Sequence, residues 1–305
     1  MVNSELEEVL SLEIPPEWDG KMVKEVIRQT LGISRGLLRK IVAENGVFVN
    51  GRPVYITSRI QAGDLLRLRT MPEWSEDILP QPIPFEVVYE DRDVLVVNKR
   101  AGLVVHPTKG HYTGTLANGV VHYWREQGET ARFRPVHRLD KNTSGLLLIG
   151  KNHFSHQRLS EQIAHRQFRR EYLAVVHGIV KEPAFAIDAP IMKKAGDPRE
   201  RVVSESGQPA ITHVAVERLL QSATLVRLRL ETGRTHQIRV HMRHIGHPLF
   251  GDDLYGIGHR DGMERQALHA EVLGFSHPRQ GKRLEFTAPV PPDMQELIDR
   301  LTLTL

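Results

Sequence analysis

The sequence predicts an α+β protein with a mixed, largely antiparallel sheet, flanking helices and a smaller α/β domain at its N-terminal end. Its 305 residues suffice for about two domains that each bury a core. The β-rich runs after residue 85 do not alternate regularly with helical runs, which disfavours a doubly wound parallel sheet. A proline-rich polar stretch separates these runs from a basic N-terminal segment. We therefore expect an N-terminal domain over 1–72, a linker over 73–84 and a second domain over 85–305.

Composition excludes several classes of protein. Cysteine is absent, which excludes disulfides, a thiolate nucleophile and cysteine-bound metal, and agrees with a cytoplasmic location. No apolar run approaches the roughly 18 residues that span a membrane, and the acidic first residues are unlike a secretory signal. The net charge of +4 is too small to establish a nucleic-acid partner by itself.

The N-terminal domain is predicted to contain two short helices. Apolar residues at three-to-four-residue spacing across 20–33 are typical of a helix. Gly32 interrupts this pattern, and Ser34 can cap a second helix that ends near residue 45. The polar face of the second helix carries Arg35, Arg39 and Lys40.

A small sheet is expected after these helices. Short β-favouring runs flank Asn50-Gly51, a strong signal for a two-residue hairpin. Residues 63–69 alternate leucine with arginine, as a half-buried strand does. The cations of this domain, including Arg52, form either a solvated face or a surface for a partner, and charge alone favours the solvated face.

Residues 15–70 resemble the small RNA-binding module named after ribosomal protein S-four. The match consists of the second helix in SRGLLRKIVAENG, the V-x-V-N-G hairpin and the later G-D strand. The resemblance implies that the basic side of the second helix lies on RNA phosphates. The residues expected there are Arg35, Arg39, Lys40 and Arg52.

The second domain is expected to alternate strands and helices irregularly. The predicted elements are three β-rich runs within 85–107, a helix over 113–127, a strand over 146–151, a helix over 154–168, a strand ending at Gly178, and two strands within 213–232. The remaining residues mix helix and strand.

One segment of this domain holds a candidate catalytic residue. Residues 137–148 read HRLDKNTSGLLL and place a single acid, Asp140, among basic and small polar residues before an apolar run. A carboxylate held beside cations can act as a nucleophile or a base on an anionic substrate. The same pattern also suits a turn that enters a buried strand, with Asp140 as a capping acid. Spacing alone leaves both interpretations open.

A histidine-bound metal is a weaker interpretation of the later sequence. Four histidines, His236, His241, His244 and His247, fall within twelve residues. They lack the H-E-x-x-H spacing, and no cysteine is available. Partial strand-like alternation over THQIRVHM would put His236 and His241 on opposite faces. Structural hydrogen bonding is therefore the better expectation, and we predict no metal.

Two other hydrolytic mechanisms also fit poorly. Thr143-Ser144-Gly145 is not the G-x-S-x-G turn that presents a serine nucleophile. A glycosidase requires two carboxylates, and nothing in the sequence singles out Glu171 or Asp252 as the second one.

Three segments of the second domain resemble the pseudouridine synthases of the RluA/RluD type. They are HRLDKNTSG (137–145), RREYLAVVHG (169–178) and TGRTHQIRVHMRHIGHPLFGD (232–252), and VNKRAGLVVHP (97–107) and GQPAITHVAV (207–216) also match. The resemblance keeps the family's order over residues 85–290. It implies a pseudouridine synthase fold that isomerises uridine in structured RNA without a cofactor. It implies no membrane and no obligatory protein partner; the N-terminal module favours ribosomal RNA, with transfer RNA as the alternative.

The resemblance assigns roles to individual residues. Asp140 aligns with the family's essential aspartate, which either attacks C1′ or removes a proton from C2′; both routes stay open. Arg239 is the cation expected to keep Asp140 ionised, with Arg234 as the competing candidate. Tyr172 is expected against the target base, although tyrosine also commonly fills strands. Arg138, two residues before Asp140, is expected to face the RNA.

The chain departs from the family pattern at Arg100, Asn142 and Arg170, where proline, aspartate and lysine are common. These departures leave the RNA target open. The basic stretch 193–203 is a candidate extra contact, or an exposed hairpin tip. An RNA-binding assembly factor without turnover would share the basic module, but the joint presence of Asp140, Tyr172 and Arg239 argues for an enzyme.

Overall fold

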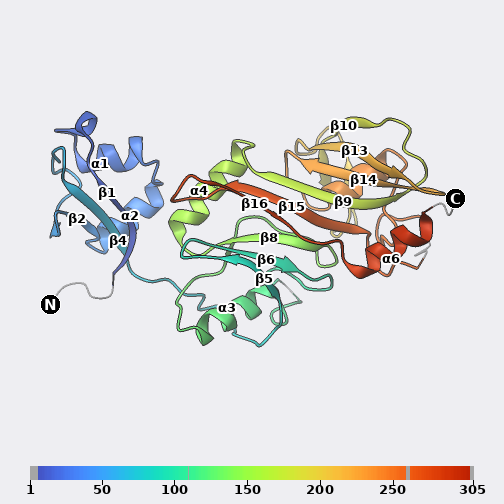
Figure 1. Ribbon diagram of the computed structural model, residues 1–305, viewed down its shortest axis with the longest axis horizontal. Coiled ribbons are helices and arrows are strands. Elements are labelled where there is room, and N and C mark those ends of the chain that lie inside the picture. The colour runs from blue at the N-terminus through green and yellow to red at the C-terminus, as the bar shows by residue number, and fades with distance from the viewer. Residues whose placement is uncertain (1–5, 109, 259–261, 303–305) are drawn as a thin grey trace.

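The computed structural model describes residues 6–108, 110–258 and 262–302 (Figure 1). It contains a four-stranded sheet near the N-terminus, a ten-stranded mixed sheet and a two-stranded ribbon, with helices packed around them. The predicted α+β class is therefore confirmed. The outermost residues of the predicted domains, 1–5 and 303–305, lie outside the described residues.

The four-stranded sheet is antiparallel and has the order β1-β4-β2-β3. Its strands are β1 (Glu7–Glu13), β2 (Val47–Val49), β3 (Arg52–Pro53) and β4 (Leu65–Thr70). Asn50 and Gly51 have φ of 49° and 78°, the left-handed conformation that the predicted hairpin requires. Strand β1 adds to the elements expected from the sequence.

Helices cover one face of this small sheet. They are the short 3₁₀ turn Pro16–Trp18, α1 (Val23–Glu25) continued by a π-helical turn (Val26–Thr30), and α2 (Arg35–Ala43). The Ser34 hydroxyl accepts a hydrogen bond from the backbone N–H of Leu37 at 3.2 Å, so the predicted cap is confirmed. Phe154, from a later helix, joins the apolar core beneath α2.

The large sheet has the order β10-β13-β14-β9-β15-β8-β6-β5, with β16 beside β15 and β7 beside β8. Only the β15–β8 pair is parallel among the named pairs. The strands are β5 (Glu86–Glu90), β6 (Val94–Lys99), β7 (Arg134–Pro135), β8 (Ser144–Gly150), β9 (Arg169–His177), β10 (Ala184–Asp188), β13 (Ile211–Leu219), β14 (Ala223–Leu230), β15 (Leu268–Ser276) and β16 (Arg283–Thr287). The separate ribbon pairs β11 (Ile191–Lys193) with β12 (Arg201–Val203).

Four helices accompany the large sheet: α3 (Leu116–Glu126), α4 (His153–Ala164), α5 (Gln237–His244) and α6 (Pro292–Leu301). In Figure 1, α3 and α4 lie toward the β5–β8 half and α6 lies at the far end, away from the N-terminal sheet. No helix in the described ranges is long and apolar enough to cross a membrane.

Two local expectations are wrong. The strand-like pattern of THQIRVHM belongs to helix α5, in which every residue from Gln237 to Met242 is buried, so its alternation does not reflect exposure. The third β-rich run of 85–107 forms no strand; instead Leu103 and Val105 pack into the main core. In α5, burial from all sides replaces the one-sided burial that a strand pattern assumes. Residues 103–106 keep the alternating burial of a strand but pair with no neighbouring strand of the described ranges.

The segment predicted as a linker packs against the large-sheet domain and helix α3. Ile78 is buried in the main core. The Asn118 side chain on α3 donates to the carbonyl of Leu79 at 2.8 Å, and the N–H of Gln81 donates to the carbonyl of Asn118 at 3.1 Å. We keep 1–72, 73–84 and 85–305 as proposed divisions, with 73–84 acting as a fixed strap.

Gly145 marks a close approach of two strands, and its replacement by alanine tests this packing. Its φ is 112°, and a Cβ there would lie 2.2 Å from the carbonyl oxygen of Ala270 on β15. We expect Gly145→Ala to lower the free energy of unfolding by roughly 3–5 kcal/mol in urea denaturation. Gly128→Ala is the control, because Gly128 has φ of 71° with no atom within 4 Å of a Cβ and should cost about 1–2 kcal/mol. Equal losses would contradict the close approach.

Candidate active site

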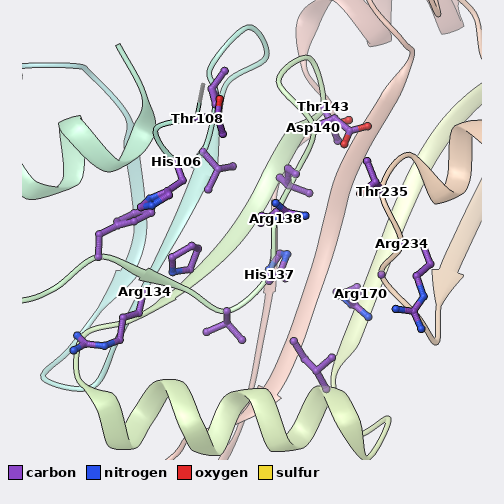
Figure 2. A pocket seen from close by; sticks show the side chains of 18 of the residues that line it. His106, Thr108, Arg134, His137, Arg138, Asp140, Thr143, Arg170, Arg234 and Thr235 are labelled. Atoms are coloured by element: carbon purple, nitrogen blue, oxygen red, sulfur yellow. The ribbon is translucent and has the colours of Figure 1, made fainter. Parts of the chain in front are cut away.

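A cavity of about 1370 Å³ lies between β9, the loop before α5 and the segment that leads into β8 (Figure 2). Five residues that the sequence nominates line it: Arg138, Asp140, Tyr172, Arg234 and Arg239. Residues 75–78 of the strap form part of its wall. The cavity exceeds the usual volume of a site for one small molecule, which leaves room for more than a single nucleotide.

Asp140 sits in a turn that precedes β8. The N–H of Thr143 donates to the carbonyl of Asp140 at 3.1 Å and closes the turn. Three side chains from other segments donate hydrogen bonds to the turn. Lys99 Nζ donates to the carbonyl of Lys141 (3.0 Å), Arg265 Nη1 donates to the carbonyl of Asn142 (3.2 Å), and Gln266 Nε2 donates to Thr143 Oγ1 (3.1 Å). The turn is therefore fixed from outside, while the Asp140 side chain stays 27% exposed toward the cavity.

Arg239 on α5 joins Asp140 to a second acid. Its Nε and Nη2 donate to the two oxygens of Asp252, both at 2.7 Å. Its Nη1 donates to Asp140 Oδ2 at the longer distance of 3.4 Å, and its Nη2 also reaches Asp253 at 3.2 Å. Bidentate pairing fixes the plane of the guanidinium. Asp252 therefore orients Arg239, and one N–H of Arg239 remains directed at Asp140.

Burial and charge act in opposition within this cluster. Burial alone disfavours the charged form of Arg239, but the hydrogen bonds and charge of Asp252 outweigh it and raise the pKa of Arg239. Burial likewise disfavours the charged form of Asp252, and Arg239 outweighs it and lowers the pKa of Asp252. Both partners therefore stay charged at neutral pH.

Two further residues stand close to Asp140. His236 Nε2 lies 3.9 Å from Asp140 Oδ2, while its Nδ1 hydrogen-bonds the Tyr255 hydroxyl at 2.9 Å. His236 adopts the left-handed conformation, with φ of 57°, a strain that often marks functional sites. Burial lowers the pKa of Lys99 to about 7, with Asp140 opposing that shift.

The loop before α5 is held by one side chain. The side-chain oxygen Oε1 of Gln237 accepts from the Thr232 hydroxyl at 2.8 Å and from the backbone N–H of Arg234 at 2.9 Å. Its amide nitrogen donates to the carbonyl of Ile211 on β13 at 3.0 Å. Gln237 thereby ties the loop to the sheet and fixes the start of α5, which carries Arg239.

Tyr172 lies on β9, opposite Leu228 of β14 and Ala270 of β15. It is 5% exposed, belongs to the main core and lines the cavity. Burial raises the pKa of its hydroxyl. Tyr172 therefore belongs to the core, as the alternative from the sequence expected, and also lines the cavity; its contact with the target base stays a prediction.

The two arginines flanking the trio differ in their contacts. Arg138 is exposed and lines the cavity with Asp140, as the two-residue spacing indicates. Arg234 is also exposed, but its Nε donates to the carbonyl of Pro209 at 3.0 Å. Of the two candidates for the partner of Asp140, Arg239 makes the direct contact among the described residues.

The cations nominated in the N-terminal sheet region fall into two groups. Arg35, Arg39 and Arg52 are exposed. Lys40 instead lies 3.8 Å from Glu44 and pairs with Glu73 of the strap. Glu73 also pairs with Arg134, which lines the cavity.

The histidine-rich segment serves structural contacts. His241 hydrogen-bonds Thr212 and the carbonyl of Ala189, both at 2.9 Å, and His247 bonds the carbonyl of His177 at 2.8 Å. Within the described ranges, no three histidine, aspartate or glutamate side chains gather as metal ligands do.

Sequence reasoning missed the roles of Asp252 and Lys99. Asp252 ends the motif FGD and Lys99 stands in VNKRAG, both inside segments that carry the family resemblance. The available signal was that both residues stand in matching motifs although the sequence assigned them no role. Their partners, Arg239 and the carbonyl of Lys141, follow only from the fold.

The site is that of an enzyme that presents the Asp140 carboxylate beside Arg239 in a cavity that Tyr172 also lines. The sequence matches the family described as RNA pseudouridylate synthase over residues 93–244, and the RluD ribosomal pseudouridine synthase N-terminal domain over residues 10–66. The chain belongs to the RNA pseudouridine synthase family of the RluA/RluD type, whose members are isomerases that act on RNA.

Individual relatives agree with this assignment. The uncharacterized RNA pseudouridine synthase YlyB of Bacillus subtilis is 46% identical over 271 residues, covering 88% of this chain and 89% of the relative. The ribosomal large subunit pseudouridine synthase D of Yersinia pestis is 40% identical, covering 88% and 86%. The solved structure of human RNA pseudouridylate synthase domain containing 1 is 26% identical with a TM-score of 0.57, covering 72% of this chain and 96% of that one.

Removal of Asp252 should reveal its part in the cluster. Asp252→Ala leaves the buried Arg239 guanidinium without its bidentate partner, so we expect the free energy of unfolding to fall by about 3–5 kcal/mol. Urea denaturation measures this loss. Asp253→Ala is the matched control, because the Asp253 side chain contacts the same guanidinium but is 60% exposed and should cost less than about 1 kcal/mol. Similar losses would mean that Asp252 does not anchor Arg239.

Proposed function

We propose that this chain isomerises specific uridines in ribosomal RNA, with Asp140 as the reacting carboxylate and without a cofactor or metal. The observation that carries the proposal is the convergence of three residues. Asp140, Tyr172 and Arg239 are far apart in the sequence and line one cavity, with Arg239 Nη1 3.4 Å from Asp140 Oδ2.

The chemistry needs these three groups. The reaction breaks the bond between C1′ and N1 of uridine and forms a bond between C1′ and C5, after which the C5 proton leaves and N1 gains a proton. Asp140 either attacks C1′ as N1 leaves and departs when C5 bonds to C1′, or removes a proton from C2′ as N1 leaves and returns it when C5 bonds to C1′. Arg239 stabilises the carboxylate, and Tyr172 supplies a face on which a flipped base can turn.

The proposal of ribosomal RNA as substrate rests on the relatives. The relative from Yersinia pestis is named for the large ribosomal subunit, and residues 10–66 match a domain named for a ribosomal enzyme. Exposed Arg35, Arg39 and Arg52 suit contact with RNA phosphates. We place the protein in the cytoplasm on the same grounds.

Asp140→Asn tests the catalytic assignment. The change removes the carboxylate and keeps its size, so we expect release of tritium from 5-tritiated uridine in transcribed ribosomal RNA to fall roughly 10³-fold or more. Asp253→Asn, which alters a carboxylate near the same arginine, should keep most of the activity.

Full activity in Asp140→Asn would overturn the role of Asp140. Rescue of a gene-deletion phenotype by the Asp140→Ala protein would favour an RNA-binding factor instead of an enzyme. Mapping pseudouridines with and without the gene identifies the target uridine.

Salt dependence tests the N-terminal cations. Each phosphate contact removed should lower the slope of log affinity against log salt by about 0.7–0.9. We expect Arg35→Ala, Arg39→Ala and Arg52→Ala each to lower the slope by this amount in full-length protein. Lys40→Ala should lower it less, because Lys40 is paired with Glu44 and Glu73. Unchanged slopes in all three arginine variants would exclude this surface as the RNA grip.

A further inference from the structure

A buried cation in the cavity has no counter-ion among the residues that the structure describes. Arg170 on β9 is 6% exposed, lines the cavity and has an Nε with no hydrogen-bond partner. Its guanidinium lies over the ring of Phe168 at 5.9 Å, and no ion pair joins it to another residue of the described ranges. Burial of a charge without a partner costs several kcal/mol. An anion that enters the cavity would offset this cost.

His137 offers a second unused donor beside Arg170. It is 8% exposed, and its Nε2 accepts from the N–H of Leu148 at 3.3 Å. Burial, with Arg170 adding to it, lowers the pKa of His137 to about 3, so the ring is neutral at pH 7. A neutral imidazole that accepts at Nε2 carries its proton on Nδ1, and that Nδ1 has no hydrogen-bond partner.

Both residues line the cavity, with the Arg170 Nε and the His137 Nδ1 themselves buried in its wall. In Figure 2, Arg170 lies between His137 and Arg234, with Asp140 further along the cavity. A Cβ on Gly233 would lie 3.0 Å from Arg170 Nη1, so the absence of a side chain leaves the guanidinium room. Arg170 and Tyr172 stand two positions apart on β9 and therefore face the same side, about 7 Å apart along the strand.

We propose that Arg170 and His137 bind a phosphodiester group next to the target uridine. This proposal rests on the proposed function, because it takes the uridine to lie between Asp140 and Tyr172. An anion is the ligand class that suits both unused donors, since Arg170 supplies charge and His137 supplies a neutral N–H. The phosphate is the anionic part of an RNA strand, and the offset between Tyr172 and Arg170 separates its position from that of the base.

Binding of small RNA probes tests the proposal without any turnover. The probes are the trinucleotide ApUpA and its two forms in which one phosphodiester is a neutral methylphosphonate. With the unchanged protein, we expect one of the two neutral forms to bind about tenfold more weakly or worse. In Arg170→Gln the unmodified trinucleotide should lose the same factor, and the difference between the probes should vanish.

Two variants control this comparison. Arg169→Gln changes the preceding arginine, which is paired with Glu171 and Glu285, and should keep the difference between the probes. Arg170→Lys retains the charge and should therefore keep part of the difference between the probes. His137→Gln should reduce the difference, because it removes the Nδ1 donor.

Equal binding of all three probes to the unchanged protein would overturn the phosphate site, whether or not the variants fold. An undiminished difference in Arg170→Gln would also overturn it. The site and the catalytic assignment fail separately. A probe difference that depends on Arg170, together with an active Asp140→Asn enzyme, would retain the phosphate site and reject the role of Asp140.

Discussion

The bidentate pairing of Arg239 with Asp252 is the interaction on which the site depends. A buried guanidinium stays charged and needs an anion, and Asp252 supplies one with both oxygens at 2.7 Å. This pairing uses Nε and Nη2 and leaves Nη1 directed at Asp140. Asp140 is therefore held by one longer hydrogen bond and remains partly exposed. The arrangement combines a fixed cation with a carboxylate that can still reach a substrate.

The sheet supplies the precision that this arrangement requires. Asp140 enters the site on the turn before β8, and Arg239 enters on the helix after β14. Lys99 of β6 holds the turn by donating to the carbonyl of Lys141. Gln237 holds the start of the helix by donating to the carbonyl of Ile211 on β13. Strands of one sheet thus set the distance between two residues that the chain separates widely.

The N-terminal region is connected to the cavity through the strap over 73–84. Glu73 pairs with both Lys40 of α2 and Arg134 of the cavity wall. Gln157 of α4 adds a second connection, accepting from the N–H of Ser34 at 2.9 Å and donating to the carbonyl of Gly32 at 2.7 Å. These contacts place the basic helix in fixed relation to the site, which suits joint contact with one structured RNA.

The sequence by itself determined the local features and the family. The Ser34 cap, the Asn50-Gly51 hairpin and the α+β class follow from short-range patterns, and ordered motifs nominated Asp140, Tyr172 and Arg239. Tertiary structure alone decided that Arg239 contacts Asp140 where Arg234 does not, that Asp252 anchors Arg239, and that THQIRVHM forms a helix. It also decided the pairing of β1 with β4, whose residues are distant in the chain. The physical reason is that side-chain pairing and burial from all sides depend on segments that folding brings together. The local periodicity of one segment does not indicate which other segments will pack against it.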